Sequence, residues 1–127
     1  MPTATTHDIS VPVESEYAPE RSNPRRAQYF FLYTITIRND GRDTVRLLRR
    51  HWTIMDANGE VHEVHGDGVV GEQPVLKPGE SFRYTSGCPL TTPFGSMHGS
   101  YEMTDQAGRE FPIEIPPFSL RDPRMMQ

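Results

Sequence analysis

The amino-acid sequence predicts an all-β protein in which two antiparallel sheets pack face to face. Apolar residues alternate with polar ones along several short segments, and glycine or proline turn signals separate these segments. No stretch shows the 3.6-residue periodicity of an amphipathic helix. Period-two alternation alone does not separate a sandwich from a small closed barrel, so the barrel remains the alternative.

The first half of the chain contains two strand patterns with a polar loop between them. Residues 9–13 alternate, but Pro12 cannot donate a ladder hydrogen bond, so we expect this strand at a sheet edge or with that position facing away from its neighbour. Residues 17–27 hold two prolines and two consecutive arginines and are expected to form a loop. The odd positions of 29–37 are all apolar or aromatic, which predicts the central strand.

The next predicted strand changes phase along its length. Its apolar residues begin at odd positions, Val45 and Leu47, and continue at even ones, Trp52 and Ile54. One extra residue in a strand produces such a change, so we expect a β-bulge near residues 47–49.

Turn signals divide the rest of the chain. Residues 56–59 (DANG) predict a hairpin turn before a short strand over 61–64. The run L-x-P-G-E-x-F-x-Y at residues 76–84 is similar to the corner of fibronectin-type sandwiches, where a tyrosine anchors the turn between sheets. Further strands are expected over 97–103 and 111–115, and the remaining tail carries little pattern.

About seven short strands of this kind predict an immunoglobulin-like or fibronectin type III-like sandwich. A chain of 127 residues forms one domain, 1–127, and buries about two-thirds of its unfolded surface. The ordered core is expected over about residues 8–120, with loose N-terminal and C-terminal ends.

Charge and cysteine usage restrict the partners and the compartment. Thirteen basic and 17 acidic residues give a net charge of −4, which disfavours nucleic acid and anionic membranes as partners. The sequence has no apolar run long enough to span a bilayer, and its first ten residues lack an export signal, so we expect a cytoplasmic protein. The single cysteine, Cys88, cannot form an internal disulfide and is expected to be a small buried side chain rather than a nucleophile.

Three glycines, Gly66, Gly68 and Gly71, match the pattern G-x-G-x-x-G. In dinucleotide-binding folds this pattern needs a helix after the last glycine, and Pro74 and Pro78 leave no room for one. The dinucleotide interpretation is therefore excluded. A turn with positive φ angles remains, and its backbone N–H groups could form a nest for an anion.

Two histidines and an aspartate, His62, His65 and Asp67, are the candidates for a divalent cation. Residues three apart on a strand point to opposite faces, so these side chains converge only if the chain bends. We therefore expect neither a metal nor a cofactor, and solvated loop histidines instead.

No set of residues amounts to an active site. Thr85, Ser86, Cys88 and His98 have no spacing that requires a nucleophile and its base to meet, so we expect no enzymatic activity.

A basic and aromatic patch is also present, and it is either a surface for phosphate or acidic partners or a solvated face. Its members are Arg42, Arg46, Arg49, Arg50 and Trp52.

Three longer strings resemble the bacterial ApaG family. They are HGDGVVGEQPVLKPGESFRYTSG (65–87), TPFGSMHGSYEM (92–103) and FPIEIPPFSL (111–120), and the likeness runs from about residue 9 to residue 120. The resemblance implies a fibronectin-type or immunoglobulin-like sandwich, a cytoplasmic bacterial protein and an association with cobalt and magnesium efflux. It also implies kinship with the ApaG-like domains of some F-box proteins and of a polymerase-delta-interacting protein, where the domain looks like a partner-binding module.

The hypothesis that follows is a non-enzymatic module that binds another protein through the glycine loop and its neighbours. The loop residues are Gly66, Gly68, Gly71, Glu72, Gln73 and Pro74, which match the family pattern one by one. An exposed edge strand could also recruit a partner or pair two copies of this chain as a homodimer. The alternative is a small-ligand binder that holds a phosphate, a nucleotide or a divalent cation at Gly66–Gly71.

Overall fold

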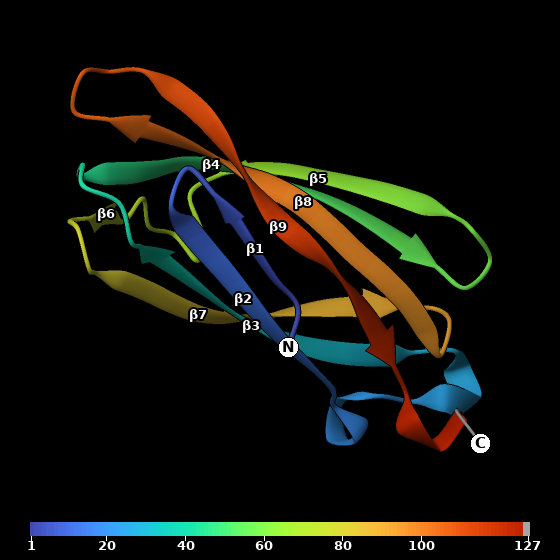
Figure 1. Ribbon diagram of the computed structural model, residues 1–127. Helices are drawn as coiled ribbons and strands as arrows, with labels where there is room; N and C mark the ends of the chain where they lie inside the picture. Colours follow the sequence, from blue (N-terminus) through green and yellow to red (C-terminus); the bar gives the residue numbers. More distant parts are fainter. Residues whose placement is uncertain (126–127) are drawn as a thin grey trace.

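Two antiparallel sheets face each other in the structure, a computed structural model that describes residues 1–125 (Figure 1). The first sheet has the strand order β1-β2-β3-β7, with β1 (Thr3–Thr6), β2 (Ile9–Tyr17), β3 (Tyr29–Asn39) and β7 (Ser81–Leu90). The second has the order β5-β4-β8-β9, and β6 pairs beside β4. Its strands are β4 (Val45–Asp56), β5 (Val61–Asp67), β6 (Val75–Leu76), β8 (Phe94–Asp105) and β9 (Glu110–Arg121). The predicted sandwich is thus confirmed over the closed barrel.

Within residues 1–125, the remaining regular elements are three short 3-10 helices, η1 (Pro19–Arg21), η2 (Pro24–Arg26) and η3 (Pro123–Met125). In the part of the chain that the structure describes, no helix has the length and hydrophobicity that crossing a membrane requires.

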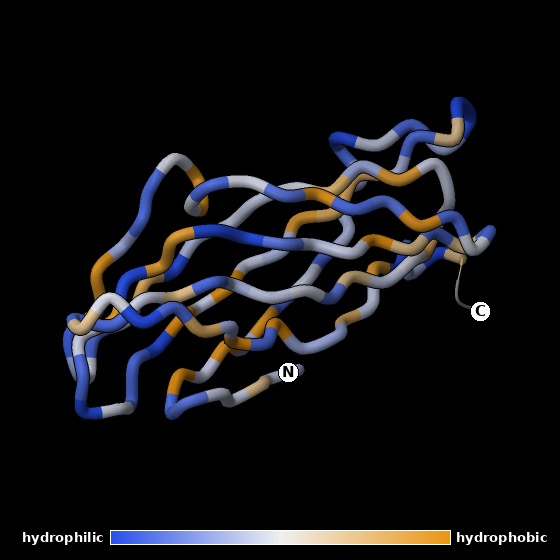
Figure 2. The backbone as a smooth tube through the Cα atoms, turned by 90° about the horizontal axis from the view of Figure 1, so that it is seen from above, coloured by the Kyte–Doolittle hydropathy of each residue, from blue (hydrophilic) through white to orange (hydrophobic). Residues whose placement is uncertain are grey.

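The core lies between the sheets and follows the alternation of the sequence. Figure 2 shows hydrophobic and hydrophilic residues alternating along the strands. In β3, Phe31, Ile35 and Ile37 point inward and are buried, and in β9 Ile113 and Ile115 do the same. These side chains fill the space between two layers, as in other β-sandwiches.

The expected loose N-terminal end contains β1, which pairs with β2 through a tight turn at His7 and Asp8. Both turn residues have positive φ, 50° and 62°. Hairpin turns of this conformation usually carry glycine at the second position, where this chain has Asp8, so the sequence does not predict the turn.

Prolines of β2 and β9 lie where the ladders of these strands are interrupted. Strand β2 lies between β1 and β3 rather than at an edge, and its pairing with β3 skips Val11 and Pro12. The sequence predicts a strand only as far as residue 115, but β9 continues to Arg121. The strand can continue because Pro116 and Pro117 lie at a register shift opposite β8 and make no ladder pair there. A bulge tolerates residues that cannot donate to the ladder.

The corner at residues 76–84 is anchored by an asparagine instead of a tyrosine. Asn39 is 1% exposed, and its Nδ2 donates to the carbonyls of Asp43 and Leu76 at 2.8 and 3.0 Å. The hydroxyl of Tyr84 lies 2.5 Å from that of Tyr101, in the core between the sheets. The corner expected from the sequence is therefore present, but its tyrosine has another partner.

Candidate functional site: a glycine loop beside an open groove

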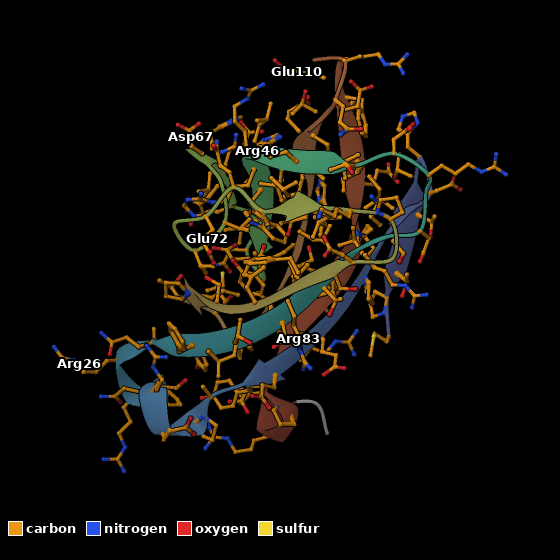
Figure 3. All side chains as sticks on the ribbon, turned by 90° about the vertical axis from the view of Figure 1, so that its left-hand side faces the viewer. Arg26, Arg46, Asp67, Glu72, Arg83 and Glu110 are labelled. Carbon is orange, nitrogen blue, oxygen red and sulfur yellow. The ribbon has the colours of Figure 1, made fainter. Side chains whose placement is uncertain are left out.

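The glycine loop connects β5 to β6, and no helix lies between Gly71 and β6. The exclusion of a dinucleotide-binding helix is therefore confirmed. Strand β5 extends beyond the expected 61–64, so Gly66 lies within the strand, opposite Arg50, rather than in the loop. Figure 3 labels Asp67 and Glu72 in this region beside Arg46 of β4, apart from Arg26. The loop lies where β4 exchanges one pairing partner for another, because β5 pairs with Arg49–Met55 and β6 with Val45 and Arg46.

The tip of the loop is a tight turn closed by two backbone hydrogen bonds. The Val69 N–H donates to the Glu72 carbonyl at 2.8 Å, and the Glu72 N–H donates to the Val69 carbonyl at 2.9 Å. The two central residues, Val70 and Gly71, have φ of 44° and 80°. Positive φ is costly for a β-branched residue, so Val70 is held in a strained conformation.

The predicted β-bulge in β4 is confirmed by a register shift between Leu47 and Arg49, and it anchors the loop. The Leu48 carbonyl accepts from the Gly68 N–H at 2.8 Å and from Gln73 Nε2 at 2.9 Å. Arg46 Nη2 donates to Gln73 Oε1 at 3.2 Å. The Pro74 carbonyl accepts from the Leu47 N–H of β4 at 3.0 Å. Gln73 and Pro74 thus hold the loop in place, and the N–H groups of Gly68, Val69 and Glu72 already donate within the chain.

One arginine of the expected basic patch, Arg50, lies directly behind the loop. Its Nη1 donates to the carbonyls of Asp67 and Gly68, at 2.9 Å each. The guanidinium rests against Gly66, where a Cβ atom would lie 2.6 Å from Nη2. Among residues 1–125, no carboxylate lies within ion-pair distance of Arg50. Its positive charge is therefore without a counter-ion in the described chain.

Most other members of that patch are separated from Arg50. Arg49 points to the opposite face of the sheet and pairs with Glu110. Trp52 lines the same two cavities as Arg50 but is buried in the core. Arg42 lines a different cavity, and Arg46 is used by the loop. The patch predicted from the sequence is therefore not one surface.

The two sheets are joined along one side of the sandwich and open along the other. On the joined side, the Glu114 N–H donates to Thr6 Oγ1 at 3.1 Å, and Ser15 Oγ donates to the Ser119 carbonyl at 2.9 Å. On the open side, β5 and β7 are the last strands of their sheets and have free edges. Between them lies a groove of about 490 Å³. We call it the edge groove; its walls include Trp52, Ile54, His62, Val64, Cys88 and Leu90.

Arg50 lies where the edge groove meets a smaller cavity of about 210 Å³ under the loop tip. Val70 and Gly71 line this cavity, and Tyr33 and Ser86 line both spaces. The site is therefore apolar along most of its length, with a cation and two hydroxyl groups at one end.

Burial raises the pKa of two weakly acidic side chains of the groove, the Tyr33 phenol and the Cys88 thiol. It raises the pKa of Tyr33, although a hydrogen bond with Ser86 lowers it in part. Burial also raises the pKa of the Cys88 thiol to about 11. Cys88 is 3% exposed, as expected for a small buried side chain, and it is a neutral thiol near pH 7. His98 pairs with Thr53 on the outer face of its sheet and does not approach Cys88 or Ser86.

The two histidines named as candidate cation ligands point in different directions. His62 pairs with Ile54 and faces the edge groove, whereas His65 pairs with His51 on the outer face. The alternation of β5 separates them, as the spacing indicated. His65 instead groups with His51 and Glu63. His51 is twelve residues before Glu63, so only the strand register reveals this group.

Comparisons with known proteins agree with the observed fold. The family described as "ApaG domain" matches residues 19–105. A protein from Methylocella silvestris named "Protein ApaG" is 55% identical over 123 residues, which are 97% of this chain and 95% of that protein. A protein of the same name from Rhodopseudomonas palustris is 56% identical over 120 residues, 94% of this chain and 92% of that protein.

Solved structures show the same architecture. A Bordetella pertussis protein crystallised under the name ApaA superposes with a TM-score of 0.90 at 46% identity, covering 96% of this chain and 99% of that one. A second X-ray structure superposes with a TM-score of 0.87 at 47% identity, covering 93% of this chain and 89% of that one.

Proposed function

This chain belongs to the ApaG family, and we propose that it is a non-enzymatic module that binds an extended, acidic segment of another protein in the edge groove. The glycine loop closes one end of this groove. Arg50 carries the proposal, because it is a half-buried cation without a carboxylate among residues 1–125. A partner that supplies a carboxylate beside Arg50 would form a charge-assisted pair in partly desolvated surroundings.

The walls of the groove suit an extended segment. The free edges of β5 and β7 offer backbone donors and acceptors to an added strand. Val64 faces the groove and is 39% exposed, and Val70 at the loop tip is 55% exposed. Strained backbone tends to be kept where it serves a function, and Val70 combines such a backbone with an exposed apolar side chain.

The glycine loop has a supporting role in this proposal. Gly66 leaves room for the Arg50 guanidinium, and the carbonyls of Asp67 and Gly68 orient it. The loop amides contribute less than the sequence indicated, because several of them are already bonded. A link to cobalt or magnesium efflux, which the family resemblance implies, would then act through the protein that is bound. The cytoplasm remains the expected compartment.

The experiment is a selection from a library of random nine-residue peptides with the intact protein, followed by NMR amide-shift mapping of the best binder. We expect selected peptides to alternate apolar residues and to carry Asp, Glu or a free C-terminal carboxylate. The shifts should concentrate on β5, β7 and residues 66–71. Arg50→Gln should weaken binding tenfold or more, since it removes a charge-assisted contact.

The matched control is Arg49→Gln, the neighbouring arginine on the opposite face, which should bind the peptide as the native protein does. Equal binding by native protein and Arg50→Gln would contradict the proposal. So would shifts that map to β1 and β9, or a library that yields no binder. The other possible occupant of the groove is a second copy of this chain, and sedimentation of the free protein tests whether it dimerises.

A second candidate is a small anionic ligand, favoured by the 210 Å³ cavity in which Arg50 meets the hydroxyls of Tyr33 and Ser86. Inorganic phosphate, pyrophosphate and ATP are the probes. Saturable shifts confined to residues lining this cavity, lost in Arg50→Gln, would favour the small ligand over the peptide. This candidate places the anion beside Arg50 instead of in the loop-amide nest that the sequence left as an alternative.

A further inference from the structure

His51, Glu63 and His65 form a cluster on the outer face of the β4–β5 ribbon. His51 of β4 is directly opposite His65 of β5 in the antiparallel register. Their rings are stacked, with centroids 4.2 Å apart and planes inclined by 8°. Glu63 is two residues before His65 and therefore shares its face. Its Oε1 lies 3.3 Å from His51 Nε2.

We propose that this cluster is a binding site for a divalent transition-metal cation of the zinc class, with His51, Glu63 and His65 as its ligands. One potential ligand atom from each residue lies within 4.8 Å of the other two. Two imidazole nitrogens and one carboxylate oxygen are the donor set of zinc sites that keep a fourth position for water or another ligand.

Only modest movement brings these atoms to bonding positions. Metal–ligand bonds of about 2.1 Å in tetrahedral geometry place the ligand atoms about 3.4 Å apart. The stacked rings must turn so that their nitrogens converge. The side chains of His51 and Glu63 are 37% and 58% exposed, so this rotation breaks no core packing.

The β4–β5 ladder fixes the backbone positions of the two histidines more firmly than a loop would. His51 and His65 are held in register by two strands, and their Cβ atoms share one face of the sheet. The adjoining hollow, of about 470 Å³, also contains Asp67 and Glu102. Arg49 and Arg50 line the same hollow, so their charges offset those of the two carboxylates, and the attraction for a cation comes from the three ligands themselves.

A second cluster, Asp56, Glu60 and His62, is a poorer donor set. It offers one imidazole, and Asp56 Oδ1 already accepts the N–H groups of Asn58 and Glu60 at 2.8 and 3.0 Å. The metal ligands are distinct from the walls of the edge groove, because His51 and His65 face away from the interior; Arg50 borders both the groove and the hollow beside the cluster.

The test is a titration of the intact, tag-free, chelator-treated protein with zinc chloride, followed by calorimetry and by NMR of the histidine rings. We expect saturable binding of one zinc per chain, with the largest shifts at His51 and His65. His51→Ala and His65→Ala should each weaken binding tenfold or more, and Glu63→Gln should weaken it less. His98→Ala, on the same face but outside the cluster, should bind zinc as the native protein does.

Circular dichroism confirms that each variant is folded before its affinity is compared. Absence of saturable binding up to 1 mM zinc (roughly the weak end of specific affinities) would overturn the proposal. Shifts centred on Asp56, Glu60 and His62 would also overturn it. Equal affinity of His51→Ala, His65→Ala and native protein would do the same.

Discussion

Replacing Gly68 by alanine tests the packing of the glycine loop most sharply. Gly68 has a φ of 62°, and a Cβ atom there would lie 2.3 Å from the Glu72 carbonyl oxygen. A left-handed backbone costs an L-residue about 1–2 kcal/mol. Forcing a methyl group against a fixed backbone atom costs about a further 1–3 kcal/mol. We therefore expect Gly68→Ala to lower the free energy of unfolding by about 3 kcal/mol.

The matched control is Gly71→Ala in the same turn. Gly71 has a φ of 80°, but no atom lies within 4 Å of the position that a Cβ atom would take there. This variant carries the backbone cost alone, so it should lose only about 1–2 kcal/mol.

Urea denaturation followed by tryptophan fluorescence measures both free energies, since Trp52 is buried in the core. The m-values of both variants should match the native one, because only the native state is affected. A difference of less than about 0.5 kcal/mol between the two variants would refute the close contact of Gly68 with Glu72.

Three further predictions concern the core and the corner. Asn39→Ala removes three hydrogen bonds of a buried side chain and should cost about 3 kcal/mol in urea denaturation, against less than about 0.5 kcal/mol for the exposed Asn58→Ala. Tyr84→Phe leaves the Tyr101 hydroxyl without its 2.5 Å partner and should cost about 1–3 kcal/mol. Adding Tyr101→Phe should restore part of this loss, and a double variant less stable than the single one would count against the pairing. Burial raises the pKa of Cys88 to about 11 in the folded state, whereas the unfolded thiol ionises near pH 9. The free energy of unfolding should therefore fall as pH rises from about 9 to 11. Cys88→Ala should lose less stability over this range, and parallel pH curves for the two proteins would contradict a buried thiol.

Local patterns in the sequence predict several features that the structure confirms. The phase change at Leu47 predicts the bulge, because side-chain alternation records the extra residue directly. The prolines after Gly71 exclude a helix, and Gly68 and Gly71 mark a loop between strands, although Gly66 lies in β5. Each of these signals depends only on residues close together in the chain.

The remaining features depend on how distant segments meet. The turn at His7 and Asp8 has no glycine, so β1 was not expected. The edge groove exists because β5 and β7 end their sheets on the same side, and strand order is not readable from alternation. The roles of Arg50 and His51 depend on their cross-strand neighbours, Gly66 and His65, which only the register identifies.

The binding proposal is tested most directly by the affinity of a selected acidic peptide for Gly66→Ala. This variant leaves the chemistry of Arg50 unchanged, but its Cβ would lie 2.6 Å from the guanidinium and must displace it. We expect Gly66→Ala to fold and to bind the peptide at least tenfold more weakly than the native protein. Native affinity in Gly66→Ala, with the guanidinium displaced, would contradict the account.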